Sequence, residues 1–408
     1  MTSPTRTLHV DDVRRFVDEH VFTPHGRGRV GIELEWVPVP RDARCPATPE
    51  AVAACLPLPL PGGSRVTFEP GGQLELSGPA CADVGEACRA MRRDVDVARR
   101  ALAPRGVELV GEGIDPRGPR TRVVDAPRYR AMEEYFDTAW PEGRTMMRNT
   151  AAVQVNLDLD GPAATDGVDA RWQRVHDLGP VLVATFANSP FDARGRPTGW
   201  RSTRLAVWDS IDRRRTAPAH RPGLDARGAW TRYALDASTM MIRVDDTTSA
   251  ALHAPVPFAQ WMDEGHELGW PTLDDFAHHL TTLFPPVRPR GWLELRMIDA
   301  LPDEWWPVAV AVTTALVDDP AAAAVASAAA APLRGRWRDA ARTGLTDPAF
   351  RAAAERCFAV ARAALPRLGA DATTIAAAAE YHDRFVARGR TPADEQLEHW
   401  NQLLAVTG

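Results

Sequence analysis

The sequence contains no lysine, so all 48 of its basic residues are arginine. This absence excludes a Walker A loop, which places a lysine on the nucleotide phosphates, and a pyridoxal enzyme, which binds its cofactor through a lysine. It also excludes a protein kinase, whose ATP contact requires a lysine on a strand. If the chain handles ATP, metal ions and arginines must therefore neutralise the phosphate charge.

Long apolar runs and a strong excess of one charge are also absent. The longest apolar tract, residues 309–332, is cut by Asp318, Asp319 and Pro320, short of the roughly 20 residues that a membrane span needs. The 48 basic and 54 acidic residues give a net charge of −6 with no strong run of one sign. We therefore expect a soluble protein with small-molecule substrates and neither a nucleic-acid nor a membrane partner.

Cysteine is scarce, and no two cysteines have the spacing of a zinc ribbon. The odd number of cysteines also argues against a complete disulfide framework. The sequence therefore predicts free thiols in a reducing cytoplasm, and the N-terminus lacks the apolar core of a signal peptide. The five cysteines are Cys45, Cys55, Cys81, Cys88 and Cys357.

The composition of the 408 residues, 45% hydrophobic and 25% charged, is typical of a globular protein with a large core. Segments with period-2 alternation, bounded by turn residues, occur before about residue 305, whereas the chain beyond it is alanine-rich with helical spacing. We expect one catalytic domain over residues 1–408, with a sheet-containing core at 1–305 and a helical region at 306–408.

Four of the alternating segments carry acidic or amide side chains on one face. In VGIELEW, Glu33 and Glu35 share a face because successive side chains of a strand point to opposite sides. In TFEPGGQLELS, Glu69 precedes a Pro-Gly-Gly turn and Glu75 lies on the returning strand. The other two segments align Gln154 with Asn156 and Glu294 with Arg296.

Each segment alone is consistent with an antiparallel sheet whose second face is solvated. Together they favour a site, because acidic residues are depleted from strands and these faces consist almost entirely of Glu, Gln and Asn. Carboxylates that share a cavity repel each other unless divalent cations lie between them, and such oxygen ligands suit Mg²⁺ or Mn²⁺. Since Mg²⁺ commonly bridges carboxylates and phosphates, the residues predict nucleotide chemistry without a P-loop.

Longer motifs carry a resemblance to a known family. The strings GIELEW, TFEPGGQLELSGP, VQVNLD, STRLAVWDSIDRRRT and HLTTLFPPVRPRGWLELRMIDALP resemble the plant- and proteobacterial-type glutamate–cysteine ligases. The similarity is strongest to the actinobacterial branch that starts ergothioneine synthesis. The resemblance implies an α+β, glutamine-synthetase-like fold, in which a curved, mainly antiparallel sheet forms a funnel and helices pack outside it.

The resemblance also implies a reaction: ATP phosphorylates the γ-carboxyl of L-glutamate, and the amine of L-cysteine attacks the acyl phosphate to give γ-glutamylcysteine. Such phosphoryl transfer depends on positioning and charge neutralisation rather than on a protein nucleophile. Two alternatives stay open. One is a related ligase that joins glutamate to another amine, since no motif encodes a thiol pocket, and the other is a catalytically silent binding protein of the same fold.

Carried over position by position, the resemblance implies roles for individual residues. It assigns five metal ligands, of which Glu69 is also counted as catalytic: Glu33, Glu35, Glu69, Glu75 and Glu294. Gln154 and Asn156 would bind nucleotide and metal, and Arg296 would stabilise the transferring phosphoryl group. Arg204 would hold a carboxylate of glutamate with its bidentate guanidinium group. Arg215 is a further candidate for binding substrate.

Overall fold

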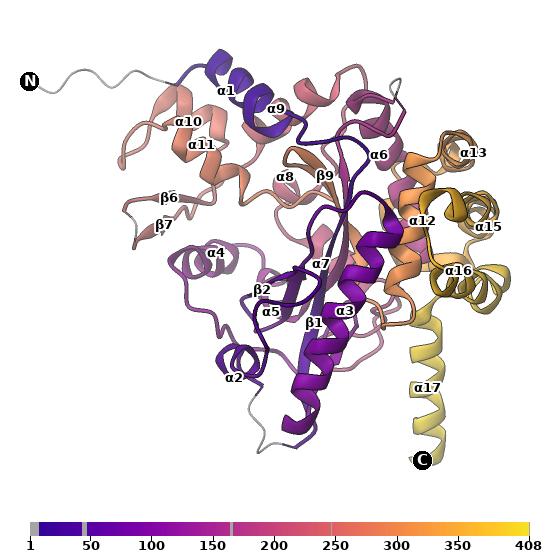
Figure 1. The fold of residues 1–408 in the computed structure, drawn as a ribbon. Helices are drawn as coiled ribbons and strands as arrows, with labels where there is room; N and C mark the ends of the chain where they lie inside the picture. Colours follow the sequence, from indigo (N-terminus) through magenta and orange to yellow (C-terminus); the bar gives the residue numbers. More distant parts are fainter. Residues whose placement is uncertain (1–7, 43–46, 164–165, 246, 408) are drawn as a thin grey trace, which may run out of the picture.

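The computed structural model describes residues 8–42, 47–163, 166–245 and 247–407. The strands of its main sheet are β1 (Val30–Pro40), β2 (Arg65–Phe68), β3 (Leu74–Ser77), β4 (Val107–Val110), β5 (Ala152–Asp158), β8 (Val287–Pro289) and β9 (Trp292–Asp299). This seven-stranded sheet has the order β2-β3-β1-β5-β9-β8, with β4 paired to β1 (Figure 1). All these pairings are antiparallel, which confirms the expected α+β class with a mainly antiparallel sheet.

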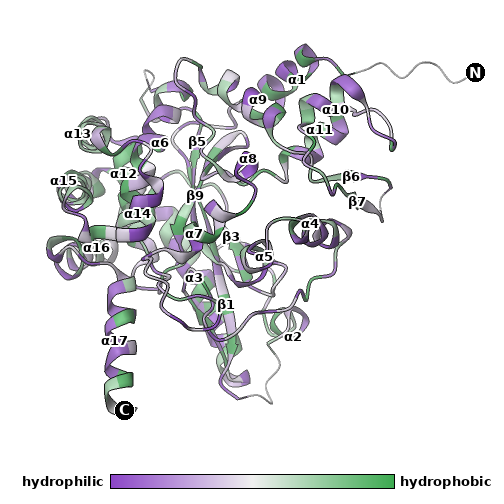
Figure 2. Cartoon of the chain, turned by 180° about the vertical axis from the view of Figure 1, so that it is seen from behind, coloured by the Kyte–Doolittle hydropathy of each residue, from purple (hydrophilic) through white to green (hydrophobic). Residues whose placement is uncertain are grey.

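Three helices cover the apolar face of the sheet. Helices α3 (Val84–Leu102), α6 (Val168–Thr185) and α12 (Trp306–Asp318) pack against β1, β9 and β5, respectively. Ile32, Leu34 and Trp36 of β1 are buried on this side, as their alternation predicts. Every residue of α12 is buried, because it packs between β5 of the sheet and the helices that follow it in the chain, and Figure 2 shows apolar colouring along α12 and β1.

The helices that follow α12 are α13 (Pro320–Ala330), α14 (Trp337–Thr343), α15 (Pro348–Ala364), α16 (Ala372–Arg384) and α17 (Pro392–Thr407). They are orange to yellow in Figure 1, and three of them, α13, α15 and α16, form a second layer on α12. Within the described chain beyond β9 there are helices and helical turns but no strands, in line with the alanine-rich spacing. The last helix, α17, points away from the body of the molecule (Figure 1).

Shorter elements surround the polar face of the sheet. The helices are α1 (Val10–Phe16), α2 (Pro49–Ala53), α4 (Pro127–Asp137), α5 (Gly143–Asn149), α7 (Thr203–Ser210), α8 (Arg213–Thr216), α9 (Ala226–Asp236), α10 (Phe258–Glu264) and α11 (Leu273–Leu280). A separate hairpin is formed by β6 (Met241–Arg243) and β7 (Ser249–Ala251), and it packs near α4. These elements enclose the polar face of the sheet.

Two further expectations concern membranes and thiols. In the part of the chain that the structure describes, no single helix is long and apolar enough to cross a membrane. The segments Trp306–Asp318 and Pro320–Leu333 pass that test only as a pair, and they meet at a bend of 97°. Four cysteines are free thiols, as predicted, and Cys45 lies outside the described residues.

Candidate active site

The strand register brings the acidic side chains of separate strands together. Glu35 on β1 lies directly opposite Glu75 on β3, and Glu33 lies opposite Gln154 on β5. Like charges in directly opposed positions of a sheet destabilise it. The pairing of Glu35 with Glu75 therefore costs free energy unless a cation or a proton lies between the two carboxylates.

The Pro-Gly-Gly turn places Glu69 beside this pair. The amide of Glu69 donates to the carbonyl of Gln73 at 2.9 Å, and the amide of Gly72 donates back to Glu69 at 2.8 Å. Gly72 has φ +85°, a left-handed conformation that favours glycine. A Cβ on Gly71 would lie 2.1 Å from the carbonyl oxygen of Arg148, so this turn packs directly on the end of α5.

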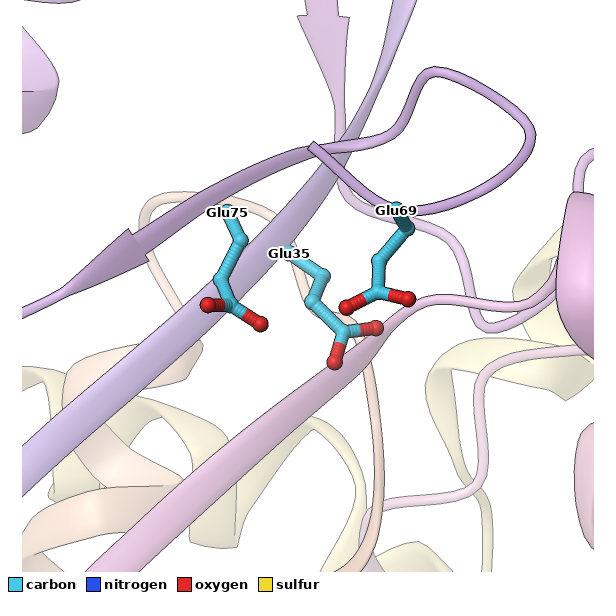
Figure 3. Close-up of side chains that lie close together, drawn as sticks. All are labelled: Glu35, Glu69 and Glu75. Atoms are coloured by element: carbon cyan, nitrogen blue, oxygen red, sulfur yellow. The ribbon is translucent and has the colours of Figure 1, made fainter. Parts of the chain in front are cut away.

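Figure 3 shows the carboxylates of Glu35, Glu69 and Glu75 pointing toward one another from β1, the turn and β3. Each can offer an oxygen within 4.8 Å of those of the other two. One oxygen of Glu75 also accepts hydrogen bonds from the hydroxyls of Thr67 at 2.7 Å and Ser77 at 2.9 Å. Three convergent, largely buried carboxylates are the donor set that Mg²⁺ and Mn²⁺ prefer, so these residues fit a divalent cation.

Burial and mutual repulsion perturb the carboxylates in the same direction. Burial, reinforced by the charges of Glu294 and Glu75, raises the pKa of Glu33 to about 7. Burial and the charge of Glu75 raise the pKa of Glu35. Burial and the charges of Glu75 and Glu35 hold the pKa of Glu69 well above its usual range. Without a cation the cluster therefore retains protons near neutral pH, and a bound divalent cation would displace them.

Gln154 links this carboxylate cluster to Arg296. Its Nε2 donates to Glu35 at 2.8 Å, while its Oε1 accepts from Nη1 of Arg296 at 2.8 Å. The register between β5 and β9 shifts between Val153 and Val155, next to both side chains. Irregularities of this kind re-aim side chains beside functional sites. The guanidinium group of Arg296 is thus fixed at the edge of the carboxylate cluster.

Glu294 lies among arginines rather than on the cavity surface. It is fully buried and accepts hydrogen bonds from Arg288 at 2.6 and 3.1 Å, with Arg290 at 3.5 Å and Arg296 at 3.4 Å. Burial opposes ionisation, but Arg288 and Arg296 hold the pKa of Glu294 at about 2. In this arrangement Glu294 neutralises guanidinium groups, and its role as a metal ligand stays a prediction.

Asn156 occupies a supporting position behind the cluster. The Nδ2 of Asn156 donates to Glu33 at 3.1 Å. Asn156 lies opposite Glu294 in the sheet and does not line the cavity. Its buried Oδ1 has no hydrogen-bond partner among the described residues. The observed contact therefore orients Glu33, and direct contact of Asn156 with nucleotide stays a prediction.

Arg204 lines the cavity from α7. Its Nη2 donates to the carbonyl of Arg296 at 2.9 Å, and its guanidinium group lies 5.8 Å from the ring centre of Trp208, one helical turn away. Burial lowers the pKa of Arg204, although the charges of Asp299 and Glu35 oppose this effect. A buried guanidinium group without a close bidentate partner is well suited to bind a substrate carboxylate.

Asp299, which the sequence analysis did not identify, is a buried carboxylate beside the guanidinium group of Arg204. Its carboxylate accepts from the hydroxyls of Ser189 at 2.7 Å and Ser202 at 2.9 Å and from the amide of Asn188 at 2.9 Å. Nη1 of Arg204 lies 3.8 Å from the same carboxylate. The signal was present in the sequence, because Asp299 ends the strand that carries Glu294 and Arg296.

Arg215 has a packing role in the structure. Its guanidinium group donates to Asp212 at 3.1 Å, to the carbonyl of Thr282 at 2.7 Å and to the carbonyl of Ser238. It also lies 5.0 Å from the ring centre of Tyr135. Arg215 is fully buried and does not line the cavity, so its role in binding substrate stays a prediction.

The carboxylate cluster opens into a cavity of about 520 Å³. Sequence reasoning missed much of its wall, which consists of further cations and of apolar side chains brought in by helices. The cations are Arg65, Arg128, Arg288 and Arg290, and the apolar group includes Met132, Met146, Met147, Trp208 and Phe284. Of these, Trp208, Phe284, Arg288 and Arg290 lie in the quoted family motifs and could have been found there.

Comparison with known proteins identifies the family. The model of glutamate–cysteine ligase family 2 matches residues 29–403. The chain belongs to this family. It is 43% identical over 391 residues to the glutamate–cysteine ligase EgtA of Mycobacterium tuberculosis H37Rv, covering 90% of this chain and 85% of that protein.

Two further members of the family are also similar to this chain. The glutamate–cysteine ligase EgtA of Mycolicibacterium smegmatis is 42% identical, with 91% and 90% of the two chains covered. The chloroplastic glutamate–cysteine ligase of Arabidopsis thaliana is 29% identical, with 83% of this chain and 66% of that protein covered. The resemblance drawn from the sequence motifs is therefore confirmed.

Proposed function

We propose that this member of the family joins L-glutamate to L-cysteine in an ATP-dependent reaction that proceeds through γ-glutamyl phosphate. The observation that carries the proposal is the convergence of Glu35, Glu69 and Glu75 beside Arg296, in a chain that resembles glutamate–cysteine ligases over most of its length. Three clustered carboxylates need compensating cations, and ATP is the substrate that brings such cations with its phosphates.

In the proposed mechanism, Glu33, Glu35, Glu69 and Glu75 would hold Mg²⁺ or Mn²⁺, which would supply charge neutralisation for the phosphates of ATP. Arg296, fixed by Gln154, lies where it can stabilise the charge on the transferring phosphoryl group. The γ-carboxylate oxygen of glutamate attacks the γ-phosphorus of ATP as ADP leaves. The chain then needs to hold the acyl phosphate and exclude water while the amine of cysteine displaces phosphate.

Arg204 would hold a carboxylate of glutamate so that the γ-carboxyl reaches the carboxylate cluster. Its position on α7, against Trp208 and with Asp299 behind it, restricts the movement of the guanidinium group. Restricted, oriented groups lower the barrier of a two-substrate reaction because less freedom is lost on reaching the transition state. Arg204 is therefore assigned to substrate orientation and Arg296 to charge stabilisation.

The proposal also includes the finer features that the family resemblance implies. They are a glutamine-synthetase-like funnel around the sheet, a cytoplasmic location and a product used for ergothioneine synthesis. The antiparallel sheet with helices on its apolar face supports the first of these. The free thiols support the second.

The test is the release of ADP from ATP by the purified protein with Mg²⁺ and glutamate, measured across a panel of amines. Cysteine should give the highest kcat/KM, and ADP release should require glutamate. Glu69→Gln should remove the activity, whereas the exposed Glu267→Gln should retain it. Faster turnover with another amine would favour a related ligase, and no turnover with any amine would favour a silent binding protein.

The bond formed provides a second test of the proposal. Activation of the γ-carboxyl requires a γ-linked dipeptide with a free thiol. Two-dimensional NMR of the product should correlate the cysteine amide proton with the side-chain carbonyl of glutamate. A correlation with the α-carbonyl would contradict the proposed acyl phosphate.

A further inference from the structure

A second cavity, of about 900 Å³, adjoins the active-site cavity. Four side chains line both cavities, so they form a partition between the two: Arg204, Trp208, Phe284 and Arg296. None of the five carboxylates assigned to the metal lines the second cavity. This cavity therefore has no part in the proposed metal site, and its volume is that of a small-molecule site.

Helices α6, α7 and α14 build much of the wall of the second cavity. Helix α14 packs on both α6 and α7, and the segment that follows α8 adds Pro218 and Pro222. A Cβ on Gly179 of α6 would lie 1.9 Å from the ring of Trp337 of α14, so the glycine allows that ring to lie directly on α6. Such packing forms the wall before any ligand arrives.

Arginines give the second cavity an excess of positive charge. It is lined by five arginines and two aspartates. Both aspartates already have arginine partners, since Asp177 lies 2.8 Å from Arg334 and Asp209 lies 3.6 Å from Arg338. The side chains of Arg334 and Arg338 are more than half exposed, so they lie at the mouth of the cavity. The remaining positive charge suits an anionic ligand, above all a carboxylate.

The rest of the lining offers flat, apolar surfaces. They come from Trp200, Leu205, Pro218, Pro286 and Trp337. The guanidinium group of Arg338 lies 5.5 Å from the ring centre of Trp200, an arrangement in which cation and ring attract each other. A planar ring can pack on such surfaces while its carboxylate reaches the arginines. The cavity thus combines the two features that bind an aromatic carboxylate.

The partition links the second cavity to the proposed glutamate site. Nε of Arg204 and Nε1 of Trp208 are buried donors without a hydrogen-bond partner among the described residues. The guanidinium groups of Arg204 and Arg296 lie 5.8 and 6.0 Å from the ring centre of Trp208, so the three side chains form one packed layer. A negative charge on either side of this layer therefore acts on the same two guanidinium groups.

We propose that the second cavity binds an aromatic carboxylate and that this ligand weakens the binding of glutamate. The binding itself does not depend on the proposed function, whereas the effect on glutamate rests on the role proposed for Arg204. The sign follows from electrostatics, because two carboxylates on opposite sides of one layer of arginines repel each other and share its positive charge. Linkage makes the effect reciprocal, so glutamate weakens the binding of the aromatic carboxylate by the same factor.

The experiment titrates the protein with three probes in saturation-transfer NMR. Indole-3-acetate carries a flat ring and a carboxylate, indole-3-acetamide keeps the ring without the charge, and acetate keeps the charge without the ring. Indole-3-acetate should bind at least about tenfold more tightly than either of the others, because only it uses both the arginines and the flat surfaces. As glutamate is added, the Kd of indole-3-acetate should rise by about fivefold and then reach a plateau.

Arg334→Gln and Arg338→Gln should each raise the Kd of indole-3-acetate by roughly two- to fivefold, the size expected for an exposed ion pair. Arg342→Gln is the matched control, because Arg342 is also exposed on α14 but lines neither cavity. Arg65→Gln is the control for the active-site cavity, which Arg65 lines without lining the second one. Both controls should bind the probe as the wild type does, and thermal melting checks the fold of each variant.

A Kd that rises with glutamate without reaching a plateau would overturn the proposal, because the probe would then occupy the glutamate site itself. Unchanged Kd values in Arg334→Gln and Arg338→Gln, or an equal change in Arg342→Gln, would overturn it as well. If glutamate binds and the Kd of the probe does not respond to it, the coupling is wrong. Absence of ligase turnover with any amine would overturn the proposed function and leave the probe titrations unaffected, so the two failures are distinguishable.

Discussion

Replacing Glu33 with glutamine should stabilise the metal-free protein at alkaline pH. Burial and neighbouring carboxylates raise the pKa of Glu33 from 4.5 to about 7. Between these values the folded protein retains a proton that the unfolded chain has lost, so stability falls as pH rises through this window. Glutamine has a similar shape and can still accept from Asn156, but it carries no charge and is free of this penalty.

The size of the effect follows from the pKa. Raising the pKa of Glu33 from 4.5 to about 7 lowers the free energy of unfolding by about 3.4 kcal/mol above pH 7. This value is an upper limit, because the neighbouring carboxylates share the effect. With about 2.1 cal/mol/K per residue, unfolding of 408 residues has an entropy of about 0.9 kcal/mol/K. The Tm of Glu33→Gln should therefore exceed that of the wild type by at most about 4 °C at pH 8.5.

The assay is thermal melting in EDTA at several pH values, followed by melting with saturating Mn²⁺. The difference in Tm between Glu33→Gln and the wild type should shrink toward pH 4.5, where Glu33 is neutral in the wild type. Saturating Mn²⁺ should raise the Tm of the wild type more than that of the variant. The exposed Glu267→Gln is the control, and its difference in Tm from the wild type should be the same with and without Mn²⁺. A lower Tm of Glu33→Gln at pH 8.5 in EDTA would refute the reasoning, because it would mean that the Glu33 carboxylate stabilises the metal-free site.

Three further predictions concern catalysis. Glu69→Gln should reduce kcat at least a hundredfold in a coupled ADP assay while its melting curve in EDTA stays cooperative; activity near that of the wild type would remove Glu69 from the metal site. Arg204→Lys should raise the KM for glutamate at least tenfold and that for ATP less than threefold, since an ammonium group cannot replace a bidentate fork; equal changes would make Arg204 structural. Asp299→Asn should shift the same two constants in the same pattern but more weakly, because it acts through Arg204; a change in the KM for ATP alone would refute this role.

The site-forming strands could be predicted because their side chains follow the period of two. Glu33 with Glu35, and Glu75 after the turn, share the polar face in the structure as the alternation indicates. The Pro-Gly-Gly sequence likewise predicted the reversal that brings Glu69 back to them. Local periodicity and turn chemistry thus place these carboxylates on one face of the sheet, but they do not decide which residues reach the cavity, since Asn156 and Glu294 do not line it.

Other contacts depend on parts of the chain that local patterns do not connect. Glu294 pairs with Arg288 because β8 folds back onto β9, and only that register puts the two side chains in contact. The resemblance assigns Arg215 to substrate binding, and its hydrogen-bond partners Thr282 and Ser238 come from segments distant in the sequence, which no local pattern connects to it. Met132, Met146 and Met147 of the cavity wall cannot be predicted for the same reason, since α4 and α5 reach the cavity only through tertiary packing.

The most direct test of the carboxylate site is anomalous X-ray diffraction from crystals grown with Mn²⁺ and a non-hydrolysable ATP analogue. The account predicts a Mn²⁺ peak within bonding distance of carboxylate oxygens of Glu35, Glu69 and Glu75, with the analogue's phosphate oxygens completing its coordination. The peak should be lost or strongly reduced in Glu69→Gln. A Mn²⁺ bound elsewhere in the cavity, with these three carboxylates uncoordinated, would contradict the central claim.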